Sequence, residues 1–186
     1  GAPTRTWIPP QFPGHAAGET RNAFDPARAQ ELLAAAGFPA GAGFPAVTMA
    51  FHDIGPEETA RMERLAAGLA ELLGVEVTAT PMESNGLFEQ VLDPATHPDM
   101  VANGGWCADF PDPQNWLSAY WHSEAATAVG MGYSNPEADA LMEEADRIVE
   151  NERRLQLYGQ AQDLLVDDVA GIFYMHNNLT FLIKPD

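Results

Sequence analysis

Apolar positions along the chain recur with two periods, one typical of strands and one typical of helices. Residues 47–51 form a short apolar run and residues 75–80 alternate, so both segments predict strands. Between them, after a Gly-Pro step and before Gly74, one stripe recurs at helical spacing: Met62, Leu65, Ala66, Leu69, Leu72 and Leu73. Strand, helix and strand in this order form a βαβ unit. We therefore expect a parallel pair of strands with a right-handed crossover.

The chain opens with a stretch rich in proline and glycine. Residues 1–20 show no apolar periodicity, so we expect an extended lead-in instead of a regular element. Three large apolar residues should pin this lead-in to the core: Trp7, Ile8 and Phe12. The first helix should begin after Asp25, its N-cap, with proline in the first helical position, and should end at Gly37.

The second half of the chain is predicted to be mostly helical. Helices are expected at residues 87–92, 113–121, 136–149 and 152–169, with Ser134 or Asn135 capping the third of these. Strands are expected at residues 100–103, 172–175 and 179–183. The pattern predicts an α/β fold with a mixed sheet flanked by helices. It shows no convincing internal domain boundary, so residues 1–186 are predicted to form a single lobe.

Composition narrows the possible functions. The chain has 27 Asp and Glu against 9 Lys and Arg, which disfavours binding to nucleic acid or to an anionic membrane surface. No apolar run reaches the ~18 residues of a membrane span, so we expect no membrane insertion. The N-terminal residues also lack the charged and apolar regions of a signal peptide. One cysteine excludes an internal disulfide framework and any CxxC metal site.

Residues 103–116, NGGWCADFPDPQNW, form the most unusual segment, which follows a predicted strand and precedes a predicted helix. Loops at strand ends of α/β sheets commonly bind ligands. Asp109 stands between Trp106 and Phe110, and a carboxylate beside apolar rings can hold an ammonium group in a partly dry site. On residue types alone, Asp109 and Asp112 are more simply explained as caps of turns or of the following helix. Trp116 and Trp121 are expected in the core.

The segment GGWCADFPDPQNW resembles the GW-x-AD-[YF]-x-DP signature of the periplasmic peptide-binding proteins of ABC importers, solute-binding protein family 5. FDPARAQELLAAAGFPAG before it and YSNPEADALMEEADRIV after it resemble the same family, in the same order. The resemblance runs from about Pro9 to the end of the chain. It implies the C-terminal, second lobe of a two-lobed periplasmic-binding-protein-like fold, so the chain resembles a fragment whose N-terminal lobe is missing.

The resemblance also implies a function and a site. Asp109 would pair with the free α-amino group of a short peptide held between two lobes, and the neighbouring backbone would add hydrogen bonds. We expect the ligand-binding residues to be Gly105, Trp106, Cys107, Ala108, Asp109 and Phe110, and we expect Tyr133 and His176 to face the same cleft. Relatives can place the cysteine of this motif in a disulfide, whereas Cys107 should be a free, partly buried thiol. The protein would be periplasmic or extracellular, associated with the membrane through a permease that receives the peptide.

Several alternatives stay open. Nickel complexes, sugars and opines are bound by other members of the broad family. A hydrolase could use Asp109 and Asp112, with a metal held by His97 or His122, and an interaction module would bind no small ligand. The five histidines show no metal-site spacing, no nucleophile elbow occurs and Cys107 has no nearby basic residue. We therefore expect no enzymatic activity, no cofactor and no metal.

Overall fold

The computed structural model describes residues 2–93, 95–102, 105–176 and 182–183. The chain forms two compact units. Residues 24–106 form one, here named the sheet unit, and residues 1–23 together with 107–186 form the other, here named the helical unit. That both belong to one lobe stays a prediction of the sequence.

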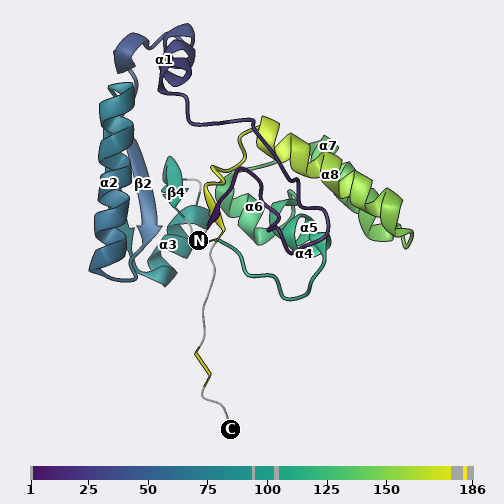
Figure 1. The fold of residues 1–186 in the computed structure, drawn as a ribbon. Coiled ribbons are helices and arrows are strands. Elements are labelled where there is room, and N and C mark those ends of the chain that lie inside the picture. The colour runs from purple at the N-terminus through teal and green to yellow at the C-terminus, as the bar shows by residue number, and fades with distance from the viewer. Residues whose placement is uncertain (1, 94, 103–104, 177–181, 184–186) are drawn as a thin grey trace. The chain divides into compact units, whose positions relative to one another are not determined.

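The sheet unit is built on three parallel strands, β2 (Val47–His52), β3 (Val77–Met82) and β4 (Met100–Ala102), in the order β3-β2-β4. Helix α2 (Pro56–Leu73) connects β2 to β3 and runs beside β2 (Figure 1). The predicted βαβ arrangement with a parallel pair is confirmed. The hydrophobic core between β2 and α2 contains the buried residues Met49, Phe51, Met62 and Ala66.

The apolar stripe of α2 is buried less completely than its spacing suggests. Met62 and Ala66 are buried, but Leu65 is 43% exposed. A sheet with three strands covers only a narrow strip of the helix. The helix ends as predicted at Gly74, whose φ of 69° is left-handed. A Cβ on Gly74 would lie 2.4 Å from the Ala40 carbonyl oxygen, so only glycine fits this close approach.

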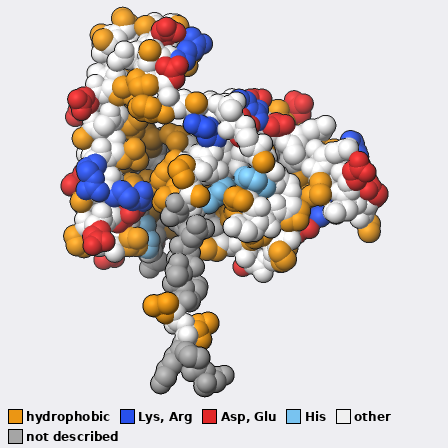
Figure 2. Space-filling view, viewed as in Figure 1, with side chains coloured by type: hydrophobic (Ala, Val, Ile, Leu, Met, Phe, Trp, Pro, Cys, Tyr) orange, Lys and Arg blue, Asp and Glu red, His pale blue; other side chains and the backbone are white. Residues whose placement is uncertain are grey.

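Helix α1 (Pro26–Ala35) begins as predicted, because the Asp25 side chain accepts a hydrogen bond from the Arg28 N–H at 2.9 Å. None of its residues is buried. A hollow of about 530 Å³ lies between α1 and α2, lined partly by Phe24, Leu65 and Leu72. Figure 2 shows hydrophobic side chains gathered beside α2 on this face. A 3-10 turn at Pro39–Gly41 follows α1.

Helix α3 (Ser84–Leu92) corrects one prediction in the sheet unit. The sequence predicted a helix at residues 87–92, but the helix begins three residues earlier, so that Asn85 and Gly86 lie inside α3. The helical hydrogen bonds already begin with the Leu87 N–H, which donates to the Glu83 carbonyl at 2.9 Å. Glycine costs a helix only about 1 kcal/mol relative to alanine, too little to stop it here.

The helical unit is dominated by two packed helices, α7 (Pro136–Arg147) and α8 (Asn151–Asp167). Of the two predicted caps for α7, Asn135 is the N-cap, and its side chain accepts from the Glu137 N–H at 2.9 Å. The predicted helix at 113–121 is divided at Leu117 into α4 (Pro113–Trp116) and α5 (Ser118–Trp121). A further helix, α6 (Ala126–Met131), was not predicted.

Two short strands complete the helical unit. β1 (Ala2–Pro3) pairs antiparallel with β5 (Met175–His176), where the sequence predicted a strand at 172–175. Most of the strand predicted at 179–183 lies outside the described residues. The predicted α/β class is confirmed, with parallel pairs in the sheet unit and an antiparallel pair in the helical unit.

The lead-in is part of the core of the helical unit, as its three large apolar residues predicted. Ile8 is fully buried. The Trp7 indole N–H donates to the Trp116 carbonyl at 2.5 Å, and Phe12 meets the Trp116 ring with centroids 5.3 Å apart. Trp121 is also buried, which confirms its predicted place with Trp116 in the core.

Candidate functional site

Asp109, the residue of most interest in the signature loop, is exposed and is held by a buried neighbour, Asn115. The backbone N–H of Asp109 donates to Asn115 Oδ1 at 3.1 Å, and Asn115 Nδ2 donates to Asp109 Oδ2 at 3.5 Å. Asn115 lies on α4 and is only 3% exposed. Among the described residues, no hydrogen bond is made to the other carboxylate oxygen of Asp109, which therefore stays available to a donor from outside.

Asp112, the second carboxylate of the loop, is fully occupied. It is the N-cap of α4, as predicted, and accepts from the Gln114 N–H at 2.9 Å. Arg154 binds it with both arms of the guanidinium, at 2.7 Å to Oδ2 and 2.5 Å to Oδ1. The hydrogen bonds from Arg154 lower the pKa of Asp112, so this carboxylate is ionised and neutralised by its partner.

Arg154 is itself fixed by contacts within the helical unit. Its guanidinium carbon lies 5.0 Å from the centre of the Tyr158 ring. The Tyr158 hydroxyl donates to Asp146 Oδ1, and the Ser118 hydroxyl donates to the same oxygen at 3.0 Å. The start of α4 is thus tied through α8 to α7 and α5.

The other predicted loop residues are distributed between the two units. Cys107, Ala108 and Phe110 lie in the helical unit, and Gly105 and Trp106 belong to the sheet unit. Phe110 is 43% exposed. Cys107 is free but exposed, so the expected partial burial of its thiol is wrong. Cys107 lies in a stretch, residues 105–108, that forms neither helix nor strand. Asn103 and Gly104 lie outside the described residues.

Tyr133 was predicted for the cleft and is engaged with the end of α8. Its hydroxyl donates to Asp168 Oδ2 at 2.8 Å, and Asn135 Nδ2 donates to the same oxygen at 2.7 Å. Its ring meets Trp121 edge-on with centroids 5.6 Å apart. Burial, and secondarily the bond to Asp168, raises the pKa of Tyr133. Its hydroxyl remains protonated at neutral pH and serves as a donor.

His176, the other residue predicted for the cleft, is bound to the lead-in. Its Nε2 lies 3.2 Å from the Trp7 carbonyl oxygen, and its ring centroid lies 6.4 Å from that of His15. Burial lowers the pKa of His176, which favours the neutral ring. Its assignment to a ligand site, like that of Tyr133, stays a prediction.

Asn115 and Arg154 are the residues that sequence reasoning missed. Asn115 carries no motif of its own, although it lies six residues after Asp109 at the start of a helix. Arg154 is 42 residues from Asp112 and looks like one more charge on a solvated helix face. Only the partner of Asp112 could have been anticipated from the sequence. An N-cap aspartate uses part of its carboxylate to accept from the helix N–H, and its remaining lone pairs can accept from a cation.

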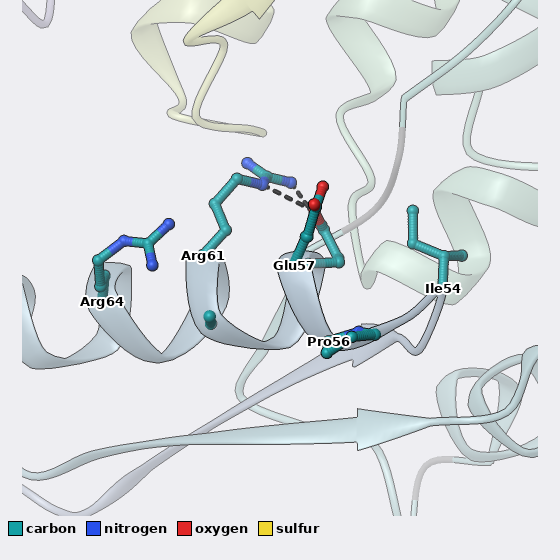
Figure 3. A pocket seen from close by; sticks show the side chains of 7 residues that line it. Ile54, Pro56, Glu57, Arg61 and Arg64 are labelled. Atoms are coloured by element: carbon teal, nitrogen blue, oxygen red, sulfur yellow. Dashed lines mark hydrogen bonds and ion pairs between the residues drawn. The ribbon is translucent and has the colours of Figure 1, made fainter.

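A second hollow lies at the start of α2 in the sheet unit, with a volume of about 690 Å³ (Figure 3). Ile54, Arg61 and Arg64 are among its lining residues, and Arg61 forms an ion pair with Glu58 at 2.5 Å. No predicted site residue lines it. Within the described ranges, no cluster of three or more His, Cys, Asp or Glu side chains could hold a metal ion, and no helix is long and apolar enough to span a membrane.

Comparison with known proteins finds relatives of this chain in sequence and in fold. The dipeptide-binding protein of Pseudomonas aeruginosa is 28% identical over 148 residues, which cover 78% of this chain and 27% of that protein. Heme-binding protein A of Haemophilus influenzae is 29% identical over 157 residues, which cover 83% of this chain and 28% of that protein. The chain therefore spans about a quarter of the length of these relatives.

Solved structures show the same fold. The dipeptide-binding protein of Pseudoalteromonas sp. SM9913, in complex with Met-Leu, superimposes with a TM-score of 0.78 at 24% identity, covering 92% of this chain and 34% of that one. A periplasmic oligopeptide-binding protein of Borrelia burgdorferi superimposes with a TM-score of 0.79 at 21% identity, covering 94% of this chain and 34% of that one. The model of the family "Bacterial extracellular solute-binding proteins, family 5 Middle" matches residues 1–128. The resemblance drawn from the signature loop is thereby confirmed, and the chain belongs to family 5 of the bacterial extracellular solute-binding proteins.

Proposed function

We propose that this chain is one lobe of the solute-binding component of an ABC importer and that it binds short peptides together with a second lobe. Family membership supports this role, as do the relatives named for dipeptide binding. The chain covers only about a third of the matching solved structures, which fits one lobe of a larger protein. The whole protein would be periplasmic or extracellular and would hand its ligand to a membrane permease.

The observation that carries the proposal is the single available carboxylate of the signature loop. Arg154 neutralises Asp112, whereas Asp109 keeps one oxygen without an internal hydrogen bond among the described residues. A peptide α-ammonium group would donate to that oxygen, and Phe110 beside it could supply an apolar wall. The hydrogen bond would be charge-assisted and would strengthen as a second lobe excludes water.

The proposed role is binding without turnover. The hydrolase alternative needs Asp112 as a second reactive carboxylate, but its two oxygens bind the guanidinium of Arg154 and its position caps a helix. His122, one of its proposed metal ligands, lies with Nε2 3.5 Å from Glu143 Oε1. These contacts favour structural roles for both residues.

The decisive experiment replaces Asp109 by asparagine in the two-lobed parent protein. Asp109→Asn should weaken binding of peptides with a free N-terminus by ~2 to 5 kcal/mol, the scale for removing one partner of a buried charge pair. N-acetylated peptides, which lack the ammonium group, should bind wild type and variant equally. Isothermal titration calorimetry measures both.

The matched control is Glu76→Gln, which removes one negative charge from an exposed position. Its affinity for the free peptide should equal that of the wild type. If Asp109→Asn binds free peptide as tightly as the wild type, Asp109 does not hold the ammonium group.

A further inference from the structure

We propose that Asn115 and Arg154 are positioning residues for Asp109, and that they hold its carboxylate in the geometry that receives a ligand ammonium group. This inference rests on the proposed function, because Asp109 matters for binding only if it contacts the ligand. Neither residue belongs to the predicted site.

Asn115 holds Asp109 directly. Its side-chain oxygen accepts from the Asp109 backbone N–H and its amide nitrogen donates to the Asp109 carboxylate, at 3.1 and 3.5 Å. Asn115 as a whole residue is 3% exposed, so surrounding groups fix the orientation of its side-chain amide. An exposed aspartate without such a partner would sample several rotamers, and a ligand would have to order it on binding.

Arg154 holds Asn115 in place through the start of α4. That helix has four residues, too few to be stable by itself. Its cap, Asp112, accepts both guanidinium arms of Arg154 and also accepts the Asn115 N–H at its carbonyl, at 3.2 Å. The side chains of Arg154 and Asp112 are 17% and 31% exposed, so this ion pair is partly shielded from water.

The charges of this group allow positioning to be separated from electrostatics. Without Arg154, Asp112 would become a second unneutralised carboxylate three residues from Asp109. If charge alone governed binding, an ammonium ligand would then bind more tightly. If Arg154 positions Asp109, the same ligand must bind less tightly.

The test uses the two-lobed parent with trialanine and N-acetyl-trialanine, titrated by calorimetry. The readout is the ratio of the dissociation constant of the acetylated peptide to that of the free peptide, which a general loss of stability would not change. In Arg154→Met and in Asn115→Leu we expect this ratio to fall by about 10-fold or more, the scale found for residues that orient the ligands of a bound metal.

The matched control is Arg153→Met on the same helix. Arg153 pairs with Glu144 at 3.0 Å, and both are exposed, so its removal makes the same change of net charge without touching the loop. Its ratio should equal that of the wild type. Arg154→Lys keeps the charge but cannot bind Asp112 with two arms, so its ratio should be intermediate.

Each other outcome has a definite meaning. A wild-type ratio in Arg154→Met, or tighter binding of free trialanine, overturns the positioning role while leaving Asp109 as the ammonium contact. If thermal melting shows that Arg154→Met does not fold, Arg154→Lys decides in its place, and an unchanged ratio there overturns the role. If the wild-type protein itself binds acetylated and free trialanine equally, so that its ratio is one, Asp109 does not contact the ammonium group. The inference then falls with it.

Discussion

Gln162 makes the interior hydrogen bonds that join the lead-in to α8. It is 1% exposed; its Oε1 accepts from the Ile8 N–H at 3.1 Å and its Nε2 donates to the Gly14 carbonyl at 3.4 Å. Gln162→Leu would keep much of the side-chain volume and would remove both the acceptor of the Ile8 N–H and the donor to the Gly14 carbonyl. The Ile8 N–H is buried with its residue, so water cannot replace the lost acceptor.

The magnitude follows from these contacts. An unsatisfied buried N–H costs ~1 to 3 kcal/mol, and the longer, partly exposed bond to Gly14 contributes ~0.5 to 1.5 kcal/mol. A buried leucine would return roughly one methylene equivalent, ~0.8 kcal/mol. The free energy of unfolding of the helical unit should fall by about 2 kcal/mol in Gln162→Leu.

Urea unfolding followed by tryptophan fluorescence tests this value. Three of the four tryptophans, Trp7, Trp116 and Trp121, lie in the helical unit, so most of the emission reports on it. With a urea dependence of ~1 to 3 kcal/mol/M, the midpoint should fall by about 1 M. Gln160→Leu, at an exposed position of the same helix, is the control and should change the midpoint little. Equal midpoints for Gln162→Leu and wild type would refute the reasoning.

Three further predictions concern other parts of the chain. Arg21 lowers the pKa of Glu19 from 4.5 to about 2, so this carboxylate contributes stability above pH 4.5 that is lost as the pH falls toward 2; urea midpoints measured across this range should decline less steeply in Glu19→Gln. Gly74→Ala should destabilise the sheet unit by about 2 kcal/mol or more in thermal melts, because of its left-handed φ and the nearby carbonyl, whereas Gly68→Ala, in open space within α2, should stabilise it by ~0.5 to 1 kcal/mol. The exposed Cys107 should react fully with an aromatic disulfide reagent without denaturant, and slow reaction that accelerates in urea would contradict its exposure.

Much of the fold depends on interactions within a few residues, and the sequence by itself predicted these features. A cap bonds to a backbone N–H two or three residues away, so Asp25 and Asp112 could be identified without knowing any tertiary contact. Residues 47–80 were predicted as a βαβ unit because both apolar periods are local. The signature loop was also found this way, since its composition and its place between a strand and a helix are visible along the chain.

Tertiary structure decided which distant residues the locally predicted groups contact. Asp112 and Arg154 are 42 residues apart, and only the packing of α8 beside α4 brings them together. The division of the predicted helix at Leu117 likewise follows from burial, because Leu117 is completely buried between two short helices whose aromatic residues pack in the same core. Spacing specifies a face of a helix, but what covers that face depends on distant segments. The sequence could therefore propose Asp109, whereas the residues that hold it became visible only in the folded chain.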